Sequence, residues 1–320
     1  MKKTLFYALS LLLVAFFVAG CGGDSKKETK MILATGGTSG TYYPLGGAMA
    51  QIWNSKAQDV NVTAQSTGAS VENLRLVDKK EAELGIVQSD TMDYAFNGTE
   101  VFKDNKLANI RAIAYMYPEF IQIVARPDKE INSIEDLKGK KVGVGAPGSG
   151  TEANFRQLIE SHGLTYDDMD PQYLSFSECA DRYKDNQIDA FIVVAGLPNS
   201  AIQDITTQHE VKILSISEEM IEKIHTKYPF LTSVAIPANT YKGQDAEVKT
   251  VAVMATLIVN STVSDDVVYS ITKALFENKD ALASANAKGK ELNIENAIKD
   301  MNIPVHPGAE KYFKEKGVLK

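Results

Sequence analysis

The sequence has few of the residues that build disulfides, metal sites and redox centres. Its 320 residues include two cysteines, four histidines and one tryptophan. If Cys21 is modified, as argued below, Cys179 is the only remaining thiol and no intramolecular disulfide can form. Cys179 has no obvious histidine partner around it, which favours a small buried side chain over a nucleophile. No histidine has a cysteine or a second histidine at metal-ligand spacing, so we predict no metal site and no cofactor.

Positive charge is also in deficit. The chain has 34 lysines and arginines against 41 aspartates and glutamates, a formal net charge of −7. A net acidic chain argues against binding to nucleic acid. The apolar and charged fractions, 44% and 23%, are those of an ordinary globular protein, with enough length for one large or two medium domains.

Long apolar runs are missing after the N-terminus. At the N-terminus, Lys2 and Lys3 precede an apolar run at residues 11–18, and small residues follow up to Cys21. This order predicts a secretory signal peptide at residues 1–20. A retained membrane helix is less favoured, because the run falls short of about 20 residues. The segment before Cys21 resembles the bacterial lipobox, in which the cysteine is acylated. We therefore expect a polar tether at residues 21–30 and an extracytoplasmic protein, periplasmic or at the cell surface, lipid-anchored to a membrane.

The body of the chain alternates predicted strands and helices, which favours an α/β fold with parallel sheets and helices on both faces. Predicted strands lie at 31–33, 60–64, 84–88, 110–117, 121–125, 141–145, 190–194, 211–214 and 251–259, and predicted helices at 43–54, 71–80, 152–161, 198–207, 265–277 and 293–300. A second strand–helix series begins near residue 121. We expect two lobes, the first from residues 31–120 plus 218–320 and the second from residues 121–217.

Two similar glycine-rich loops each follow a strand and precede a helix. The sequence "TGGTSGTYYPLGG" starts at Thr35 and "GVGAPGSGTEANF" starts at Gly143. Ligands of open parallel sheets bind beyond the carboxyl ends of the strands, where glycine lets the backbone approach closely. The following helix offers free N–H groups and partial positive charge. We predict that the two loops hold one small anion between the lobes.

The candidate ligand-binding residues come from these loops and from three similar strand-to-helix junctions. They are Thr38, Ser39, Gly40, Thr41, Tyr42, Thr67, Ser70, Gln88, Ser89, Gly148, Ser149, Thr151, Ala195 and Gly196. Gln88 can both donate and accept hydrogen bonds, which suits a ligand with an amine and a carboxylate. A surface amide is the alternative interpretation of Gln88.

Catalytic motifs are absent or weak. Residues 143–148 satisfy G-x-G-x-x-G, but Pro147 removes a backbone donor that a dinucleotide-binding turn would need. No G-K-[ST] follows, and no G-x-S-x-G elbow occurs. A nucleotide-using enzyme therefore stays a minor alternative, and we predict a binding protein that is not an enzyme.

Several motifs occur in the order found in one transporter family. They are "TGGTSGTYYPLGGAMAQIW", "STGASVENLRLVDKKEAELGIVQSD", "LKGKKVGVGAPGSGTEAN", "DAFIVVAGLPNSAIQ" and "HPGAEKYF". From about Met31 to the C-terminus the chain closely resembles the TAXI family, the extracytoplasmic solute-binding subunits of tripartite, ATP-independent periplasmic (TRAP) transporters. The resemblance implies a two-lobed, type-II periplasmic-binding-protein fold with a hinge. It also implies delivery of small carboxylates, glutamate among them, to a membrane permease driven by a sodium gradient.

The resemblance favours a TRAP receptor for glutamate or a related dicarboxylate or amino acid. The other large group of TRAP receptors uses a signature arginine for the carboxylate, and we assign no arginine of this chain that role. The alternative is an extracytoplasmic sensor domain that binds the same ligand and signals to a kinase or another receptor.

Overall fold

The computed structural model describes residues 28–319, so the predicted signal peptide, Cys21 and most of the predicted tether lie outside the described residues. The strands are β1 Thr29–Ala34, β2 Val60–Gln65, β3 Leu84–Gln88, β4 Ile110–Ala125, β5 Lys141–Gly143, β6 Asp170–Gln172, β7 Ala190–Ala195, β8 Lys212–Ile213, β9 Thr232–Ile236 and β10 Val248–Asn260. The helices are α1 Tyr42–Lys56, α2 Ser70–Asp78, α3 Ser89–Asn97, α4 Gly150–Ser161, α5 Phe176–Lys184, α6 Ser200–Thr206, α7 Glu218–Lys227, α8 Asp265–Glu277, α9 Lys279–Ala285 and α10 Pro307–Glu315.

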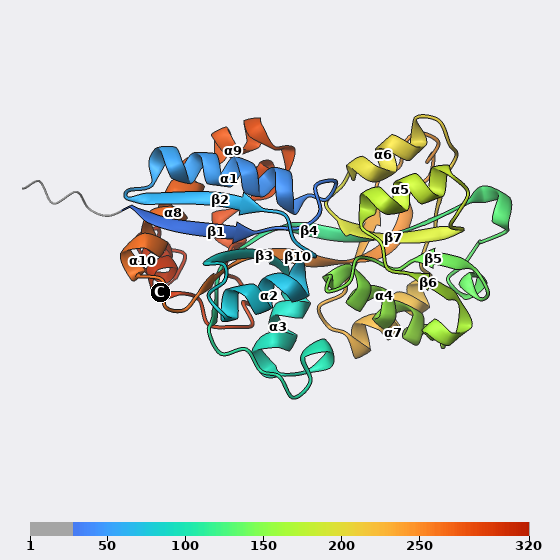
Figure 1. Cartoon of the computed structure of the whole chain (residues 1–320), viewed down its shortest axis with the longest axis horizontal. Helices are drawn as coiled ribbons and strands as arrows, with labels where there is room; N and C mark the ends of the chain where they lie inside the picture. The colour runs from blue at the N-terminus through green and yellow to red at the C-terminus, as the bar shows by residue number, and fades with distance from the viewer. Residues whose placement is uncertain (1–27, 320) are drawn as a thin grey trace, which may run out of the picture.

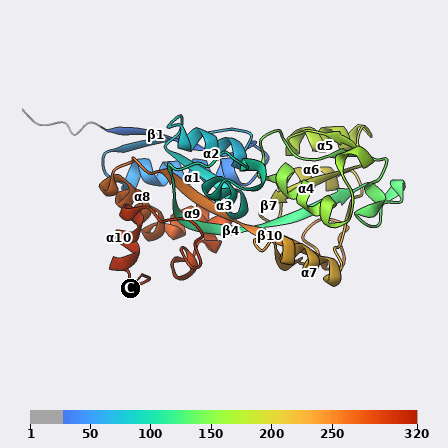
Figure 2. The same cartoon turned by 90° about the horizontal axis from the view of Figure 1, so that it is seen from below.

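The strands form one hydrogen-bonded sheet, which extends through two lobes (Figure 1). Its order is β2-β1-β3-β10-β4-β7-β5-β6, with β8 and β9 paired to β4 and β10. The expectation of parallel sheets is only partly right, because β10 runs antiparallel to β3 and β4, and β4 runs antiparallel to β7. The long strands β4 and β10 pass from one lobe to the other and form the connection between them (Figure 2).

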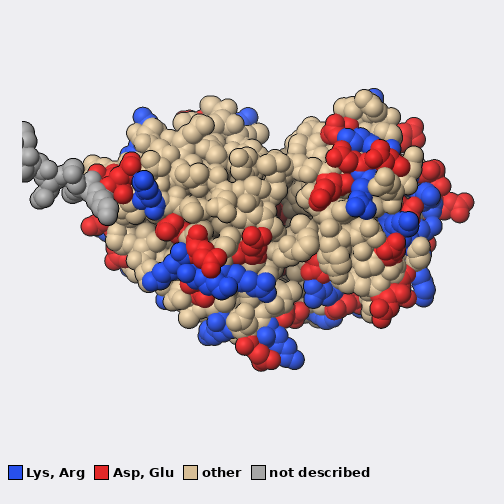
Figure 3. Space-filling view, in the orientation of Figure 1, with Lys and Arg blue, Asp and Glu red and all other residues tan. Residues whose placement is uncertain are grey.

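Each lobe buries apolar side chains on both faces of its part of the sheet. In lobe I, α1 and α8 to α10 cover one face and α2 and α3 the other. In lobe II, α4 and α7 cover one face and α5 and α6 the other. The central strands read as nearly continuous apolar runs because both of their faces are covered. Figure 3 shows the surface indented between the two lobes, with few charged side chains along the indentation.

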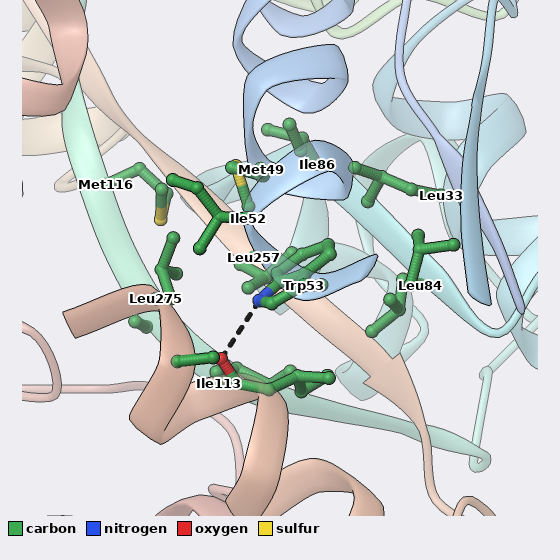
Figure 4. Close-up of a cluster of buried hydrophobic side chains, with 14 of the residues drawn as sticks. Leu33, Met49, Ile52, Trp53, Leu84, Ile86, Ile113, Met116, Leu257 and Leu275 are labelled. Atoms are coloured by element: carbon green, nitrogen blue, oxygen red, sulfur yellow. Dashed lines mark hydrogen bonds between the residues drawn. The ribbon is translucent and has the colours of Figure 1, made fainter. Parts of the chain in front are cut away.

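Trp53 lies at the centre of the lobe I core, between α1 and the sheet (Figure 4). Its indole ring is fully buried, and its Nε1–H donates to the Ile271 carbonyl of α8 at 2.9 Å. A buried indole needs such a partner, since an unpaired N–H in a core is costly. The contact fixes α1 against α8, and therefore fixes where the N-terminus of α1 lies.

Four features differ from the sequence predictions. The strands expected at 110–117 and 121–125 are one strand, β4, and the helix expected at 293–300 is only a short 3-10 turn, Ile294–Asn296. The segment from Glu218 was expected in lobe I, but Ile221 and Ile224 of α7 pack in the lobe II core. The contacts therefore favour a return to lobe I within β10. Strand β1 begins at Thr29, inside the segment expected to be tether.

No helix among residues 28–319 is both long enough and apolar enough to cross a bilayer.

Candidate functional site

Two adjoining spaces lie between the lobes, at the ends of the strands from which the predicted loops emerge. Gly37, Ala69, Thr151 and Phe176 line both of them. Their volumes are about 40 and 70 Å³. A buried water needs about 10–15 Å³ by this measure, so the first space holds about three waters. Together the two spaces, here called the cavity, admit a small molecule of several non-hydrogen atoms.

The structure brings most of the predicted site residues to this cavity. Gly40, Thr41, Tyr42, Ser70, Gln88 and Thr151 line the first space, and Ser39, Thr67, Ser149 and again Thr151 line the second. The two glycine-rich loops therefore face each other from opposite lobes. Their roles in binding a ligand stay predictions.

Five predicted residues line neither space. Thr38, Ser89, Gly148, Ala195 and Gly196 are absent from both linings. The hydroxyl of Ser89 accepts from the Met254 backbone N–H at 3.2 Å, which ties the start of α3 to β10. The carbonyl of Gly148 accepts from the Glu72 backbone N–H at 3.1 Å, which joins the lobes. Ser89 and Gly148 therefore hold neighbouring elements of the cavity in place without lining it.

Helix N-termini surround the cavity. Tyr42 begins α1, Ser70 begins α2 and Gly150 begins α4, while Gln88 immediately precedes α3. The first residues of α1, α2 and α3 have no side-chain cap. Helix N-termini carry partial positive charge that favours an anion, although the Glu72 N–H of α2 already donates to the Gly148 carbonyl and the Thr91 N–H of α3 to the Asp90 carboxylate.

The backbone is strained where α2 meets the cavity. Ala69, which precedes α2, has φ 76° and ψ −145°, a conformation that only glycine adopts readily. Ser70 then accepts from the Gln88 backbone N–H at 3.1 Å, so the turn is held against β3. Strain kept in place by such contacts is common at binding sites.

The two lobes touch through hydrogen bonds on both sides of the cavity. Asn199 Nδ2, at the N-cap of α6, and Ser200 Oγ, in its first turn, donate to the Ser39 carbonyl at 3.2 and 2.9 Å. On the other side, Asn154 Nδ2 of α4 donates to the buried Asp90 carboxylate at 2.6 Å. The lobes therefore contact each other on two sides of the cavity.

Sequence reasoning missed one charged group of the site. Glu119 of β4 lines the first space, and it is the one ionisable acid or base besides Tyr42 among the described lining residues of the cavity. It is 2% exposed, and the Tyr42 hydroxyl donates to its carboxylate at 2.6 Å. Its signal in the sequence is a lone carboxyl within the apolar run of β4. Gly150, Phe176 and Val194 are further lining residues that were not predicted.

The arrangement can bind but shows no set of reacting groups. Among residues 28–319, no three histidine, cysteine, aspartate or glutamate side chains gather as metal ligands. Cys179 is fully buried in the lobe II core, and burial raises the pKa of its thiol to about 12. A thiol in that environment is not a nucleophile at neutral pH.

Comparison with models of known protein families identifies the family of the chain. The model of the NMT1-like family matches residues 33–317. The chain belongs to the NMT1-like family. The match extends over both lobes of this NMT1-like protein and over every residue that lines the cavity.

Solved structures resemble this NMT1-like protein in fold. A protein from Bordetella bronchiseptica RB50 has a TM-score of 0.54 at 16% identity, covering 91% of this chain and 81% of that one. The periplasmic aliphatic sulphonate binding protein SsuA from Escherichia coli has a TM-score of 0.50 at 15% identity, with 89% and 83% covered. A putative L-cystine ABC transporter protein from Listeria monocytogenes has a TM-score of 0.50 at 13% identity, with 81% and 95% covered.

At these identities the likeness concerns the fold alone. The chain has the mixed α/β fold of periplasmic solute-binding proteins. The two-lobed α/β architecture expected from the sequence is thus confirmed.

Proposed function

We propose that this protein is the extracytoplasmic solute-binding component of a transporter, and that it captures a small carboxylate, glutamate or a related dicarboxylate or amino acid. The observation that carries the proposal is the cavity between the lobes, lined by residues at helix N-termini. Apart from Glu119 and Tyr42, no described residue of its lining has an ionisable side chain, and threonine and serine hydroxyls lie among glycines and apolar side chains. Such a site binds a small anion and performs no chemistry on it.

The carboxylate position follows from the lining. No lysine, arginine or histidine is among the described residues that line the cavity. The ligand carboxylate is therefore held by main-chain N–H groups and by hydroxyls such as those of Thr41, Ser70 and Thr151. Hydrogen bonds to a charged acceptor are stronger than neutral ones, so a few of them suffice for micromolar affinity, about −8 kcal/mol.

The proposal includes opening and closing of the lobes. A ligand that touches both glycine-rich loops binds the closed arrangement better than the open one, and so shifts the equilibrium toward closure. The paired strands β4 and β10 supply the connection about which the lobes can move.

The proposed partner is a TRAP membrane permease, on the basis of the TAXI-like motifs. An ABC-type permease is the second candidate, because the Listeria protein of the same fold is described as a putative ABC transporter. Uptake measured in vesicles containing the cognate permease separates the two, since TRAP uptake requires a sodium gradient and ABC uptake requires ATP.

We further propose that Cys21 carries the lipid that keeps the protein at a membrane. An extracytoplasmic sensor is the alternative to a transport component. A sensor would bind ligand but would support no uptake with either permease.

A ligand screen tests the binding function directly. We expect one or a few of the amino acids and dicarboxylates in a thermal-shift panel to raise the melting temperature. A ligand that binds only the native state adds about 2.7 kcal/mol of stability at a hundredfold excess over Kd. NAD and ATP serve as controls and should give no shift. A panel without any shift from carboxylates, together with a shift from a nucleotide, would refute the proposal.

Replacement of Gln88 by alanine tests the predicted amide contact. Gln88 is 2% exposed, and its Oε1 has no hydrogen-bond partner among residues 28–319. We expect Gln88→Ala to weaken ligand binding by about 1–3 kcal/mol, because a buried ligand group loses its partner. Calorimetry with the ligand found in the screen measures the change. Gln203→Ala, at an exposed position of α6, is the matched control and should leave affinity unchanged. Unchanged affinity in Gln88→Ala would remove this residue from the site.

A further inference from the structure

Glu119 occupies an unusual position for a carboxyl group. It lies in the middle of β4, directly opposite Val253 of β10 in the sheet. Its side chain is buried and lines the cavity together with Tyr42, Ser70 and Gln88. A side chain in this position can contact a ligand in the cavity but is screened from bulk water.

No cation within residues 28–319 balances Glu119. Among the described residues, no lysine, arginine or histidine forms an ion pair with it, and its one hydrogen bond comes from the Tyr42 hydroxyl. Burial raises the pKa of the Glu119 carboxyl to about 8, the Tyr42 hydrogen bond opposes the rise, and the Asp90 carboxyl adds to it. A buried carboxyl without a counter-charge is costly, and such groups gather at functional sites.

A second buried acceptor lines the same space. Gln88 Oε1 has no hydrogen-bond partner in the part of the chain that the structure describes, and buried polar atoms are normally satisfied. An ammonium group offers three N–H donors and a positive charge. Glu119 and Gln88 are the acceptors that such a group requires, and the helix N-termini at the same space attract a carboxylate.

We propose that Glu119 and Gln88 form an ammonium-binding subsite, so that the ligand is an α-amino acid whose carboxylate lies at the helix N-termini of the cavity. This rests on the proposed function and narrows its ligand class. The first space is small, about 40 Å³. The ligand's two charged groups therefore have to be close together, as they are on one α-carbon. A simple dicarboxylate leaves Glu119 without a counter-charge.

Calorimetry with paired ligands tests the subsite. The probes are the amino acids that give a thermal shift and, for each, the acid that lacks only the amine, for example L-glutamate and glutarate. We expect the amino acid to bind at least about tenfold more tightly than its deaminated partner, because a buried ion pair is lost in the latter. We expect Glu119→Gln to weaken binding of the amino acid by about 10- to 100-fold and to leave the deaminated acid within about threefold.

The outcomes separate this inference from the function on which it rests. Deaminated acids that bind as tightly as the amino acids overturn the ammonium subsite and leave a carboxylate receptor. A panel in which neither class binds overturns the proposed function. If Glu119→Gln lowers the melting temperature so far that binding cannot be measured, Tyr42→Phe takes its place, because it keeps the carboxyl and removes its donor.

The pH dependence of affinity is a second readout. An ammonium ligand needs Glu119 ionised, so binding below about pH 8 releases a proton, and affinity rises with pH until it levels near pH 8. An anion that accepts a hydrogen bond from a protonated Glu119 gives the opposite pH dependence, with affinity falling as pH rises through 8. Calorimetry in buffers of different ionisation enthalpy counts the protons.

Other titrating groups near Glu119 have to be distinguished from it. Tyr42 of α1 and Tyr117 of β4 both have pKa values raised well above the usual value, mainly by burial, and do not ionise in this range. Lys288 lies over the Tyr117 ring and is paired with Glu291, and the pKa of the buried Asp90 is raised. Glu119→Gln should remove the pH step, and Tyr42→Phe should move it to higher pH. A step that persists unchanged in Glu119→Gln belongs to Asp90 and overturns the inference.

Discussion

Gly150→Ala is expected to weaken ligand binding by about 10- to 100-fold while both lobes stay folded. Gly150 begins α4 in lobe II and faces lobe I across the cavity. A Cβ at this position would lie 1.6 Å from Gln88 Oε1 and 3.0 Å from Ser70 Oγ. Either the lobes remain apart or the Gln88 amide moves into the cavity, and both results exclude the ligand. Calorimetry measures the loss of affinity, and small-angle scattering with saturating ligand measures closure.

Two further variants make this result specific. Gly47→Ala lies within α1, where an added Cβ meets nothing within 4 Å, and it should bind ligand normally and be slightly more stable. Adding Gly150→Ala to a protein that already carries Gln88→Ala should cost less affinity than adding it to the unmodified protein, because the clashing amide is gone. Normal affinity in the single variant Gly150→Ala would mean that the lobes do not approach as closely in the ligand-bound state.

The meeting of the two glycine-rich loops could be predicted because it follows from local pattern. Each loop lies between a strand and a helix, and such junctions lie at the same edge of a sheet. The same rule put Ser70 and Gln88 at the cavity. It did not reveal that Thr38 and Gly196 are outside the linings, because the direction of each side chain depends on the turn that the loop makes.

Glu119 could not be predicted from local pattern. The sequence predicted two strands, at 110–117 and 121–125, and Pro118 and Glu119 lie between them. The structure accommodates them because the pairing of β4 with β10 shifts register next to this point, between Ala255 and Thr256. The shift lies opposite Tyr115 and Tyr117, and a bulge of this kind can redirect neighbouring side chains. Only the tertiary pairing shows that the carboxyl reaches the cavity.

The assignment of α7 to the wrong lobe has a similar cause. The amphipathic pattern of residues 218–227 predicts that Ile221 and Ile224 are buried, but it contains nothing about which core receives them. The long strand β10 carries side chains into both cores, with Val253 in lobe II and Leu257 in lobe I. The crossing between lobes therefore has no break in hydrophobicity that a sequence pattern could reveal.

Trp53→Ala is expected to give the largest loss of stability, about 3–5 kcal/mol. The change removes a fully buried indole from between α1, α8 and the sheet, and its surroundings cannot collapse completely into the space. Urea unfolding followed by far-ultraviolet circular dichroism measures the effect, since Trp53 is the only tryptophan of the chain and fluorescence is lost with it. Trp53→Phe keeps most of the packing and loses the hydrogen bond to Ile271, so it should cost clearly less.

The same pair of variants separates stability from binding. Trp53 does not line the cavity, but it anchors α1, which begins at the cavity with Tyr42, the donor to Glu119. Trp53→Phe should keep α1 in place and leave ligand affinity within about threefold, because the packing that positions the helix is retained. Trp53→Ala loosens that packing, and its remaining folded fraction should bind more weakly. A large loss of affinity in Trp53→Phe would show instead that the single bond to α8 sets the position of Tyr42 and, through it, of the Glu119 carboxyl.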